Sequence, residues 1–134
     1  MNLFLDSNII ISTFLSPRGT PSKAVIKAIT EGWHLMTASY NVGELFNTVA
    51  KKFVKRDLEF AVFWEQFRPY LELVETPEEV LEVEEKICDA KDRQILRAAI
   101  FAKAEIFLTG DKDFLDAEID EIKIITAAEF LELF

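Results

Sequence analysis

Near the start of the chain lies the stretch Asn2-Leu3-Phe4-Leu5-Asp6-Ser7-Asn8, a short apolar run that ends at a carboxylate. Asp, Ser and Asn are the residue types that most often cap helices, so we interpret the stretch as a strand that leads directly into a helix. The same alternation of short apolar strands and helices continues along the chain, which predicts an α/β fold with a parallel sheet covered on both faces. Further strands are expected at residues 33–37, 71–74, 105–109 and 123–126.

Helices are expected between these strands, because apolar residues recur there at helical spacing. Ser39, for example, is expected to cap a helix whose apolar face contains Val42, Leu45 and Val49. Pro77 is expected to open a short helical piece. The longer helices are predicted at residues 21–31, 39–53, 57–68, 92–103 and 127–134.

The composition is that of a globular protein. The chain has 134 residues, half of them apolar and 29% charged, which predicts one domain spanning residues 1–134. The one cysteine, Cys88, excludes an internal disulfide framework and a cysteine-rich zinc site. We find no signal peptide and no apolar run near the roughly 18 residues that a membrane span needs. These features predict a soluble cytoplasmic protein that does not bind membranes.

Aromatic residues crowd the helix expected at residues 57–68. Phe60, Phe63, Trp64 and Phe67 lie on more than one of its faces. We interpret them as core residues, and a surface for a second copy or another protein is the alternative.

The formal net charge of −9 argues against a general nucleic-acid binder, because binding phosphates usually requires a cationic surface. A nuclease meets this objection only if several of the acids are clustered at one site, where cations neutralise them. The remaining acidic excess then favours a basic protein partner or simply solubility.

Acidic residues follow two of the predicted strands. Asp6 directly follows the first strand, and Asp111 lies two residues beyond the strand at 105–109. In parallel α/β sheets the ligand site lies beyond the carboxyl ends of the strands, so both carboxylates are placed where a site is expected. Taken alone, Asp6 is better explained as an ordinary helix cap.

Asp92 is expected at the start of a helix, with its side chain pointing inward. It lies three positions before Ile95, which begins a buried stripe with Ala99 and Ala102. An inward carboxylate needs either backbone N–H groups or a cation. Taken alone, Asp92 or its neighbour Asp89 is better explained as a helix cap.

Glu44 lies opposite the apolar face of its helix, which makes a solvated surface residue the default interpretation. It shares its polar face with Thr48, Lys51 and Lys55. Such a face is suited to holding a cation and then a phosphate backbone, although a salt-bridged surface explains the sequence more simply.

The stretch Leu108-Thr109-Gly110-Asp111-Lys112-Asp113-Phe114 brings a hydroxyl, a flexible backbone and two carboxylates to the end of a strand. Asp111 and Asp113 are both able to offer oxygen atoms to a cation. A turn that starts the next helix, with hydrogen bonds between side chains and backbone, is an equally good interpretation.

Taken together and in this order, the acidic stretches resemble the PIN-domain family. They are the strand leading into Asp6-Ser7-Asn8-Ile9-Ile10, the early helical Glu44, Asp92-Arg93-Gln94-Ile95-Leu96, and Leu108 to Phe114. The segment 124–131 is similar to the final strand and helix of that family. The resemblance covers nearly the whole chain except the helical middle, 54–85. It points to stand-alone prokaryotic PIN proteins of the VapC-like group, many of them toxins of toxin–antitoxin pairs.

The resemblance implies a fold, an activity and a set of site residues. The fold is a three-layer α/β/α sandwich with a mainly parallel five-stranded sheet, and the activity is Mg²⁺- or Mn²⁺-dependent cleavage of single-stranded RNA. The catalytic and metal-binding quartet carries over to Asp6, Glu44, Asp92 and Asp111. Asp113 is implied as a further ligand, with Asn8 and Thr109 in supporting positions.

Hydrolysis of a phosphodiester bond requires an activated water and stabilisation of negative charge, which oxygen-ligated Mg²⁺ or Mn²⁺ supplies. Carboxylates that lie close together repel one another without a cation, so we expect one or more raised pKa values. No His or Cys is needed, and His34 is interpreted as a structural residue. The positive charge that holds RNA is expected from Arg18, Lys51, Lys55 and Arg93.

Two other functions remain open from the sequence. A DNA nuclease or structure-selective nuclease would use the same quartet, and a non-catalytic module that binds RNA or protein would keep the fold alone. The expected partners are an RNA substrate, a basic antitoxin protein, and further copies of the chain in a homodimer or higher oligomer.

Overall fold

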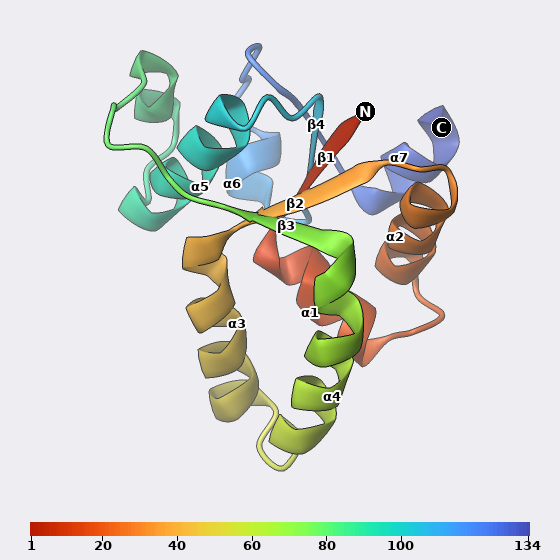
Figure 1. Cartoon of the computed structure of the whole chain (residues 1–134). Helices are drawn as coiled ribbons and strands as arrows, with labels where there is room; N and C mark the ends of the chain where they lie inside the picture. Colours follow the sequence, from red (N-terminus) through yellow and green to blue (C-terminus); the bar gives the residue numbers. More distant parts are fainter.

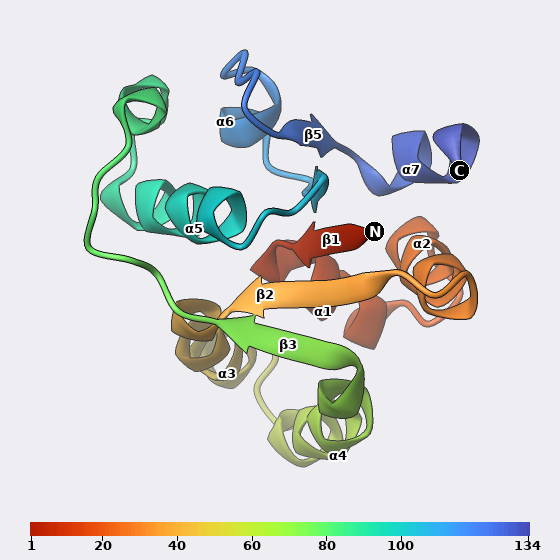
Figure 2. The same ribbon diagram turned by 45° about the horizontal axis from the view of Figure 1, so that its top comes forward.

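A computed structural model describes residues 1–134 and contains one five-stranded sheet in the order β3-β2-β1-β4-β5 (Figures 1 and 2). Every neighbouring pair of strands is parallel. The prediction of a mainly parallel five-stranded sheet is therefore confirmed, with no antiparallel strand. The strands are β1 (Asn2–Leu5), β2 (His34–Ala38), β3 (Leu71–Val74), β4 (Ile106–Leu108) and β5 (Lys123–Ile125).

Helices connect the strands in the order that the sequence predicts. One difference is the segment after β3, where Pro77 opens no helix, and a short 3₁₀ turn forms later at Glu82–Lys86 (η2). A second 3₁₀ turn, η1 (Arg68–Tyr70), leads into β3. The α-helices are α1 (Ser7–Leu15), α2 (Thr20–Thr30), α3 (Ser39–Lys52), α4 (Asp57–Phe67), α5 (Ala90–Phe101), α6 (Lys112–Leu115) and α7 (Ala127–Leu133). None of them is both long enough and apolar enough to cross a membrane.

Two hydrophobic cores lie on opposite faces of the sheet, because successive side chains of a strand point to opposite sides. In β1, Leu3 and Leu5 belong to one core, and Phe4 belongs to the other. The first core is closed by α1, α2, α3, α4 and α7, and the second by α5, α6 and η2. Figure 1 shows α1, α3 and α4 on one side of the sheet and α5 and α6 on the other. The three-layer α/β/α architecture is confirmed.

The aromatic residues of α4 are mostly core residues, as expected. Phe60, Trp64 and Phe67 are buried, and Phe63 is half-buried beside Phe14. The apolar residues exposed on this helix are instead Leu58 and Val62.

The strand order reverses direction between β1 and β4. From β1 the chain adds β2 and β3 on one side and then returns to add β4 and β5 on the other. Leu5 of β1 pairs with Leu108 of β4, so the residues that follow them, Asp6 and Thr109, leave the sheet side by side. This is the topological switch point, where open α/β sheets bind their ligands.

A buried ion pair ties η2 to α5. Glu84 is only 2% exposed, and its Oε1 accepts a hydrogen bond from Nη2 of Arg97 at 2.8 Å. Its Oε2 accepts from Nε of Arg97 at 2.9 Å and from the backbone N–H of Leu81 at 2.6 Å. The hydrogen bonds from Arg97 hold the pKa of Glu84 below its ordinary value.

We expect Glu84→Gln to lower the free energy of unfolding by about 2 kcal/mol, because the substitution replaces charge-assisted hydrogen bonds at a buried site. Urea denaturation at pH 7 measures the change. Glu82→Gln removes the same charge from an exposed position of η2 and serves as the control. If both variants unfold at the same urea concentration, the ion pair does not stabilise the fold.

Candidate metal centre

Asp6 is a buried carboxylate at the carboxyl end of β1. It is 4% exposed, and its backbone N–H donates to the carbonyl of Leu108, which continues the pairing of β1 with β4. One side-chain oxygen accepts from the N–H of Ser7 at 2.8 Å, and the other accepts from the Thr109 hydroxyl at 2.7 Å. Asp6 thus caps α1, as the simpler interpretation predicts, while its carboxylate is held toward β4.

The pKa of Asp6 is raised from its ordinary 3.8 to about 6, and burial is the largest cause. The hydrogen bonds from Thr109 and Ser7 lower the pKa, and the nearby carboxylates of Asp111 and Glu44 contribute smaller increases. The raised pKa was expected from repulsion among the acids. Removal from water is the larger cause, and repulsion is secondary.

Thr109 and Asn8 join the ends of β1 and β4 into one network. The Thr109 hydroxyl, which is fully buried, donates to Asp6 and accepts from the backbone N–H of Asp111 at 3.0 Å. The amide of Asn8 donates to Asp6 at 3.2 Å and accepts from the N–H of Gly110 at 3.2 Å. These contacts fix the orientation of Asp6 and the path of the loop that carries Asp111.

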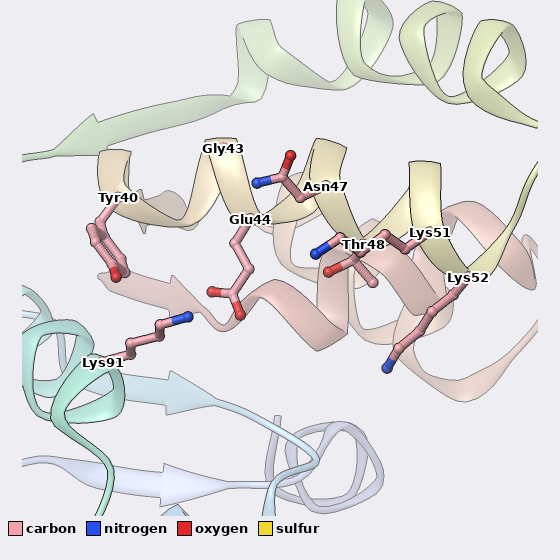
Figure 3. Close-up of a pocket in the computed structure, with 8 residues that line it drawn as sticks. All are labelled: Tyr40, Gly43, Glu44, Asn47, Thr48, Lys51, Lys52 and Lys91. Carbon is pink, nitrogen blue, oxygen red and sulfur yellow. The ribbon is translucent and has the colours of Figure 1, made fainter.

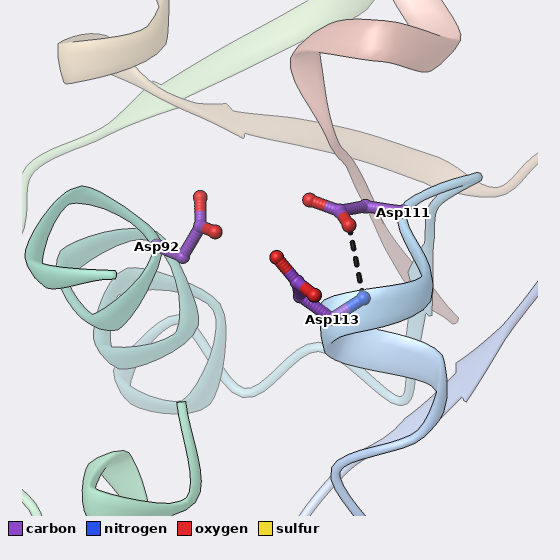
Figure 4. A group of neighbouring side chains, drawn as sticks. All are labelled: Asp92, Asp111 and Asp113. Carbon is purple, nitrogen blue, oxygen red and sulfur yellow. Dashed lines mark hydrogen bonds between the residues drawn. The ribbon is translucent and has the colours of Figure 1, made fainter. Parts of the chain in front are cut away.

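Three further carboxylates converge next to this network. Asp92 on α5, Asp111 before α6 and Asp113 in its first turn each offer an oxygen atom, and these atoms lie within 4.8 Å of one another (Figure 4). The Asp111 side chain also caps α6 by accepting from the N–H of Asp113 at 2.9 Å. The stretch 108–114 therefore forms the turn that starts α6. It also contributes two residues to the group of Asp92, Asp111 and Asp113, which we call the acidic cluster.

Asp92 is available to this cluster because another residue caps its helix. The structure places the start of α5 at Ala90, two residues earlier than the sequence suggested, and Asp89 is the cap that accepts from the N–H of Lys91 at 2.7 Å. Burial raises the pKa of Asp92 to about 6, with added repulsion from Asp89, Asp111, Asp6 and Asp113.

Glu44 lies outside the three-carboxylate cluster but faces the same side of the fold. The first turn of α3 is tied to β1, because Asn41 donates to the Thr37 hydroxyl, which donates to the carbonyl of Leu5. Glu44 follows one turn later and is half-buried. It is close enough to raise the pKa of Asp6, so it is not simply a solvated surface residue.

A cleft of about 400 Å³ runs along α3 beside Glu44, and we call it the lysine cleft. Figure 3 shows the Glu44 carboxylate turned toward the amino group of Lys91, which reaches across from α5. Lys91 and Lys52 were not among the basic residues that the sequence singled out. The residues that line the cleft are Tyr40, Gly43, Glu44, Asn47, Thr48, Lys51, Lys52 and Lys91.

The structure separates the four basic residues that were expected to hold RNA. Of these four, only Lys51 lines the lysine cleft. Because α3 ends at Lys52, Lys55 lies in the following turn with a φ of 78° and does not continue the helical face of Glu44. Arg93 donates through Nε to the carbonyl of Ile87 at 2.6 Å, and Arg18 is exposed in the loop between α1 and α2.

The acidic cluster fits a hard divalent cation. Oxygen ligands of one octahedral Mg²⁺ lie about 3 to about 4.2 Å apart, given metal–oxygen distances of about 2.1 Å. Oxygen atoms of Asp92, Asp111 and Asp113 lie within 4.8 Å of one another, which is close to this range. Carboxylates are the ligands that Mg²⁺ and Mn²⁺ prefer, and no His or Cys joins the cluster.

Comparisons with solved structures identify relatives of the fold. One is a chain of VapBC2 from Rickettsia felis bound to a DNA fragment from their promoter. It has a TM-score of 0.72 and 16% identity, covering 94% of this chain and 98% of that one. A chain of DNA-bound VapBC from Salmonella typhimurium has a TM-score of 0.70 and 16% identity, covering 95% and 98%. A chain of FitAB bound to an IR36 DNA fragment has a TM-score of 0.60 and 19% identity, covering 93% and 94%.

Sequence comparison gives the family itself. No curated protein sequence matches the chain significantly. Residues 2–113 match the family model of the PIN domain, a range that begins in β1 and ends in the acidic cluster at Asp113. The chain belongs to the PIN domain family.

Proposed function

We propose that this chain is a metal-dependent endoribonuclease that cleaves single-stranded RNA in the cytoplasm. Asp6, Glu44, Asp92 and Asp111 are its catalytic and metal-binding carboxylates, and Asp113 is a further ligand. The observation that carries the proposal is the convergence of Asp92, Asp111 and Asp113 within 4.8 Å, beside a buried Asp6 at the switch point of the sheet. Membership of the PIN domain family, whose members are typically nucleases, supports it.

Mg²⁺ or Mn²⁺ held by these carboxylates would activate a water molecule and offset the negative charge that develops on the scissile phosphate. The residues of the chain supply position and electrostatics. Thr109 and Asn8 hold the Asp6 carboxylate in one orientation. Glu44, on α3, is close enough to Asp6 to raise its pKa and would orient the attacking water through its carboxylate oxygens.

The lysine cleft would hold the RNA backbone next to this site. Lys51, Lys52 and Lys91 bring three positive charges to one cleft of a chain whose net charge is −9. This local concentration answers the objection that the overall charge raises against nucleic-acid binding, because phosphates respond to the local potential.

We expect the double substitution Lys51→Ala and Lys52→Ala to raise the KM for single-stranded RNA several-fold with little change in kcat. The slope of log KM against log salt concentration should fall by about 1.4, since two phosphate contacts with a single strand are lost. Lys23→Ala with Lys123→Ala removes two exposed charges that do not line the cleft and is the control. An unchanged salt slope would place the RNA elsewhere.

A direct test compares single-stranded RNA, single-stranded DNA and flap substrates under Mg²⁺, Mn²⁺ and EDTA. Endonucleolytic cleavage of RNA that requires the cation supports the proposal. Cleavage of DNA or flaps alone would favour the second candidate, a DNA or structure-selective nuclease with the same carboxylates. Binding without cleavage of any substrate would leave a non-catalytic module.

We further propose that the chain acts as the toxin of a toxin–antitoxin pair and binds a basic antitoxin protein. The net charge of −9 suits a basic partner, and Leu58 and Val62 are 83% and 59% exposed on α4. The fold relatives come from VapBC and FitAB structures. Co-expression with the product of a small neighbouring reading frame, followed by purification, tests the pairing. Light scattering on the chain alone tests the homodimer or higher oligomer that would use the same surface.

A further inference from the structure

Tyr40 stands between two clefts of different chemistry. One is the lysine cleft, which Tyr40 lines at the start of α3. The other is a pocket of about 340 Å³, which also includes Tyr40 and which we call the glutamate pocket. The glutamate pocket is lined by Ser39, Tyr40, Glu75, Thr76 and Gln94.

The two clefts follow the boundary between α3 and α5. Tyr40 and Glu44 are four residues apart on α3 and share a face, and Lys91 and Gln94 are three residues apart on α5 and share a face. Lys91 lines the lysine cleft, and Gln94 lines the glutamate pocket. Lys51 and Lys52 lie in the last turn of α3, on the other side of Glu44 from Tyr40 (Figure 3). An RNA strand bound along this boundary would therefore contact Lys51 and Lys52 at one end, pass Glu44 and Lys91, and reach Tyr40 at the other end.

The polar groups of the two clefts suit different parts of a nucleotide. The lysine cleft has three ammonium groups and one carboxylate, which favours phosphates. The glutamate pocket has one carboxylate, one amide and three hydroxyls but no cation, so a phosphate there would be repelled by Glu75. Hydrogen-bonding groups without positive charge are suited to the edge of a nucleobase.

We propose that the glutamate pocket is a nucleobase subsite, in which a base of the bound RNA packs on the Tyr40 ring and donates its exocyclic amino group to Glu75. This inference rests on the proposed function, because it names the part of an RNA substrate that enters the pocket. The Tyr40 side chain is 43% exposed, so its ring is accessible to a base. The geometry of single-stranded RNA suits the pocket, because only an unpaired base can turn its edge and face to protein groups.

The chemistry of Glu75 predicts which bases bind. A carboxylate accepts the amino group of cytosine, whereas uracil presents a carbonyl oxygen at the same position and would be repelled. The amide of Gln94 can donate to the ring nitrogen beside that amino group. The subsite is therefore expected to prefer cytosine over uracil.

The test measures binding of fluorescein-labelled oligocytidylate and oligouridylate by fluorescence anisotropy. Homopolymers make the result independent of which nucleotide enters the pocket, and the Asp111→Asn protein prevents cleavage during the titration. We expect oligocytidylate to bind about 10-fold more tightly than oligouridylate. Equal binding of the two, or no binding of either, would overturn the inference.

Two pairs of variants, each made in the Asp111→Asn protein, test whether Glu75 and Tyr40 cause the preference for oligocytidylate. Glu75→Gln should reduce the ratio of the two affinities toward one, while Glu79→Gln should leave the ratio unchanged. Glu79 is exposed in the same connection and does not line the pocket, so it is the matched control for the change in charge. Tyr40→Leu should weaken binding of both oligonucleotides about 10-fold, and Tyr40→Phe should retain it. If Glu75→Gln keeps the wild-type ratio, the pocket does not read the base.

Failure of this inference and failure of the proposed function give different results. If the wild-type protein cleaves RNA with Mn²⁺ but the cytosine preference is absent, only the nucleobase subsite is wrong. If the Asp111→Asn protein shows the cytosine preference but the wild-type protein cleaves nothing, the subsite stands and the chain is an RNA-binding module.

Discussion

Asp92→Asn and Asp111→Asn are each expected to lower the rate of RNA cleavage by at least about 100-fold in saturating Mn²⁺. Each substitution removes one of three carboxylates whose oxygens lie within 4.8 Å, and with it part of the charge that attracts the cation. Metal-ion catalysis contributes several kcal/mol of transition-state stabilisation, and every 1.36 kcal/mol corresponds to a factor of about 10 in rate.

The double variant Asp92→Asn with Asp111→Asn should lose little more activity than either single variant. Residues that act as one unit are strongly non-additive, because the first substitution already disables the site. Multiplied effects would instead mean that the two carboxylates act independently. Initial rates on a fluorescence-quenched RNA under single-turnover conditions measure all three variants.

Asp120→Asn is the control for the change in charge. Asp120 is exposed in the connection between α6 and β5 and is not part of the acidic cluster. Its substitution should leave both the rate and the Mn²⁺ concentration for half-maximal activity unchanged. If Asp111→Asn and Asp120→Asn behave alike, Asp111 does not bind the catalytic cation.

The sequence was sufficient for the architecture because the buried pattern of each strand is local. The apolar run 2–5 ends at Asp6 in the structure as it does in the sequence, and the alternation of Leu3, Phe4 and Leu5 between two cores follows from strand geometry. The segment after β3 was less predictable. Pro77 is typical of a helix start, but the following residues are held by the buried Glu84–Arg97 pair, which depends on a residue 13 positions away.

The acidic cluster was partly predictable for the same reason. Asp6 and Asp111 follow strands, so the parallel sheet alone brings them to one edge. From the sequence, either Asp89 or Asp92 was able to cap the helix. In the structure Asp89 is the cap, and Asp92, whose side chain was expected to point inward, lies in the cluster. Lys91 and Tyr40 had no comparable signal, since their position beside Glu44 depends on how α5 packs relative to α3.

Divalent cations should stabilise the fold strongly at pH 7.5 and only weakly at pH 5. Burial raises the pKa of Asp6 to about 6, so at pH 7.5 the folded protein holds a buried ionised carboxylate next to Asp111 and Glu44. A cation that binds only the folded state stabilises it by about 2.7 kcal/mol at 100 times its Kd, or about 8 °C in Tm for a domain of this size. At pH 5 protons compete with the cation, and most of this increase in Tm should disappear.

Without a cation, ionisation of Asp6 should lower stability as the pH rises. Its pKa is about 6 in the folded protein against an ordinary 3.8, so the folded state binds the proton more tightly. The favourable contribution is complete below pH 3.8, is lost as the pH rises through about 6, and remains absent above that pH. A pKa increase of this size corresponds to about 3 kcal/mol.

Thermal melts of the wild-type protein, Asp6→Asn and Asp120→Asn in EDTA and in Mn²⁺, between pH 4 and 8, measure both effects. As the pH rises from 4 to 7, the Tm of Asp6→Asn should increase relative to the Tm of the wild type, because asparagine does not ionise. Asp120→Asn should follow the wild type at every pH and keep its response to Mn²⁺. A constant difference between the wild type and Asp6→Asn across this range would mean that Asp6 titrates as an ordinary solvated carboxylate. A Mn²⁺ effect of equal size at pH 5 and pH 7.5 would mean that the cation binds away from Asp6 and Asp92.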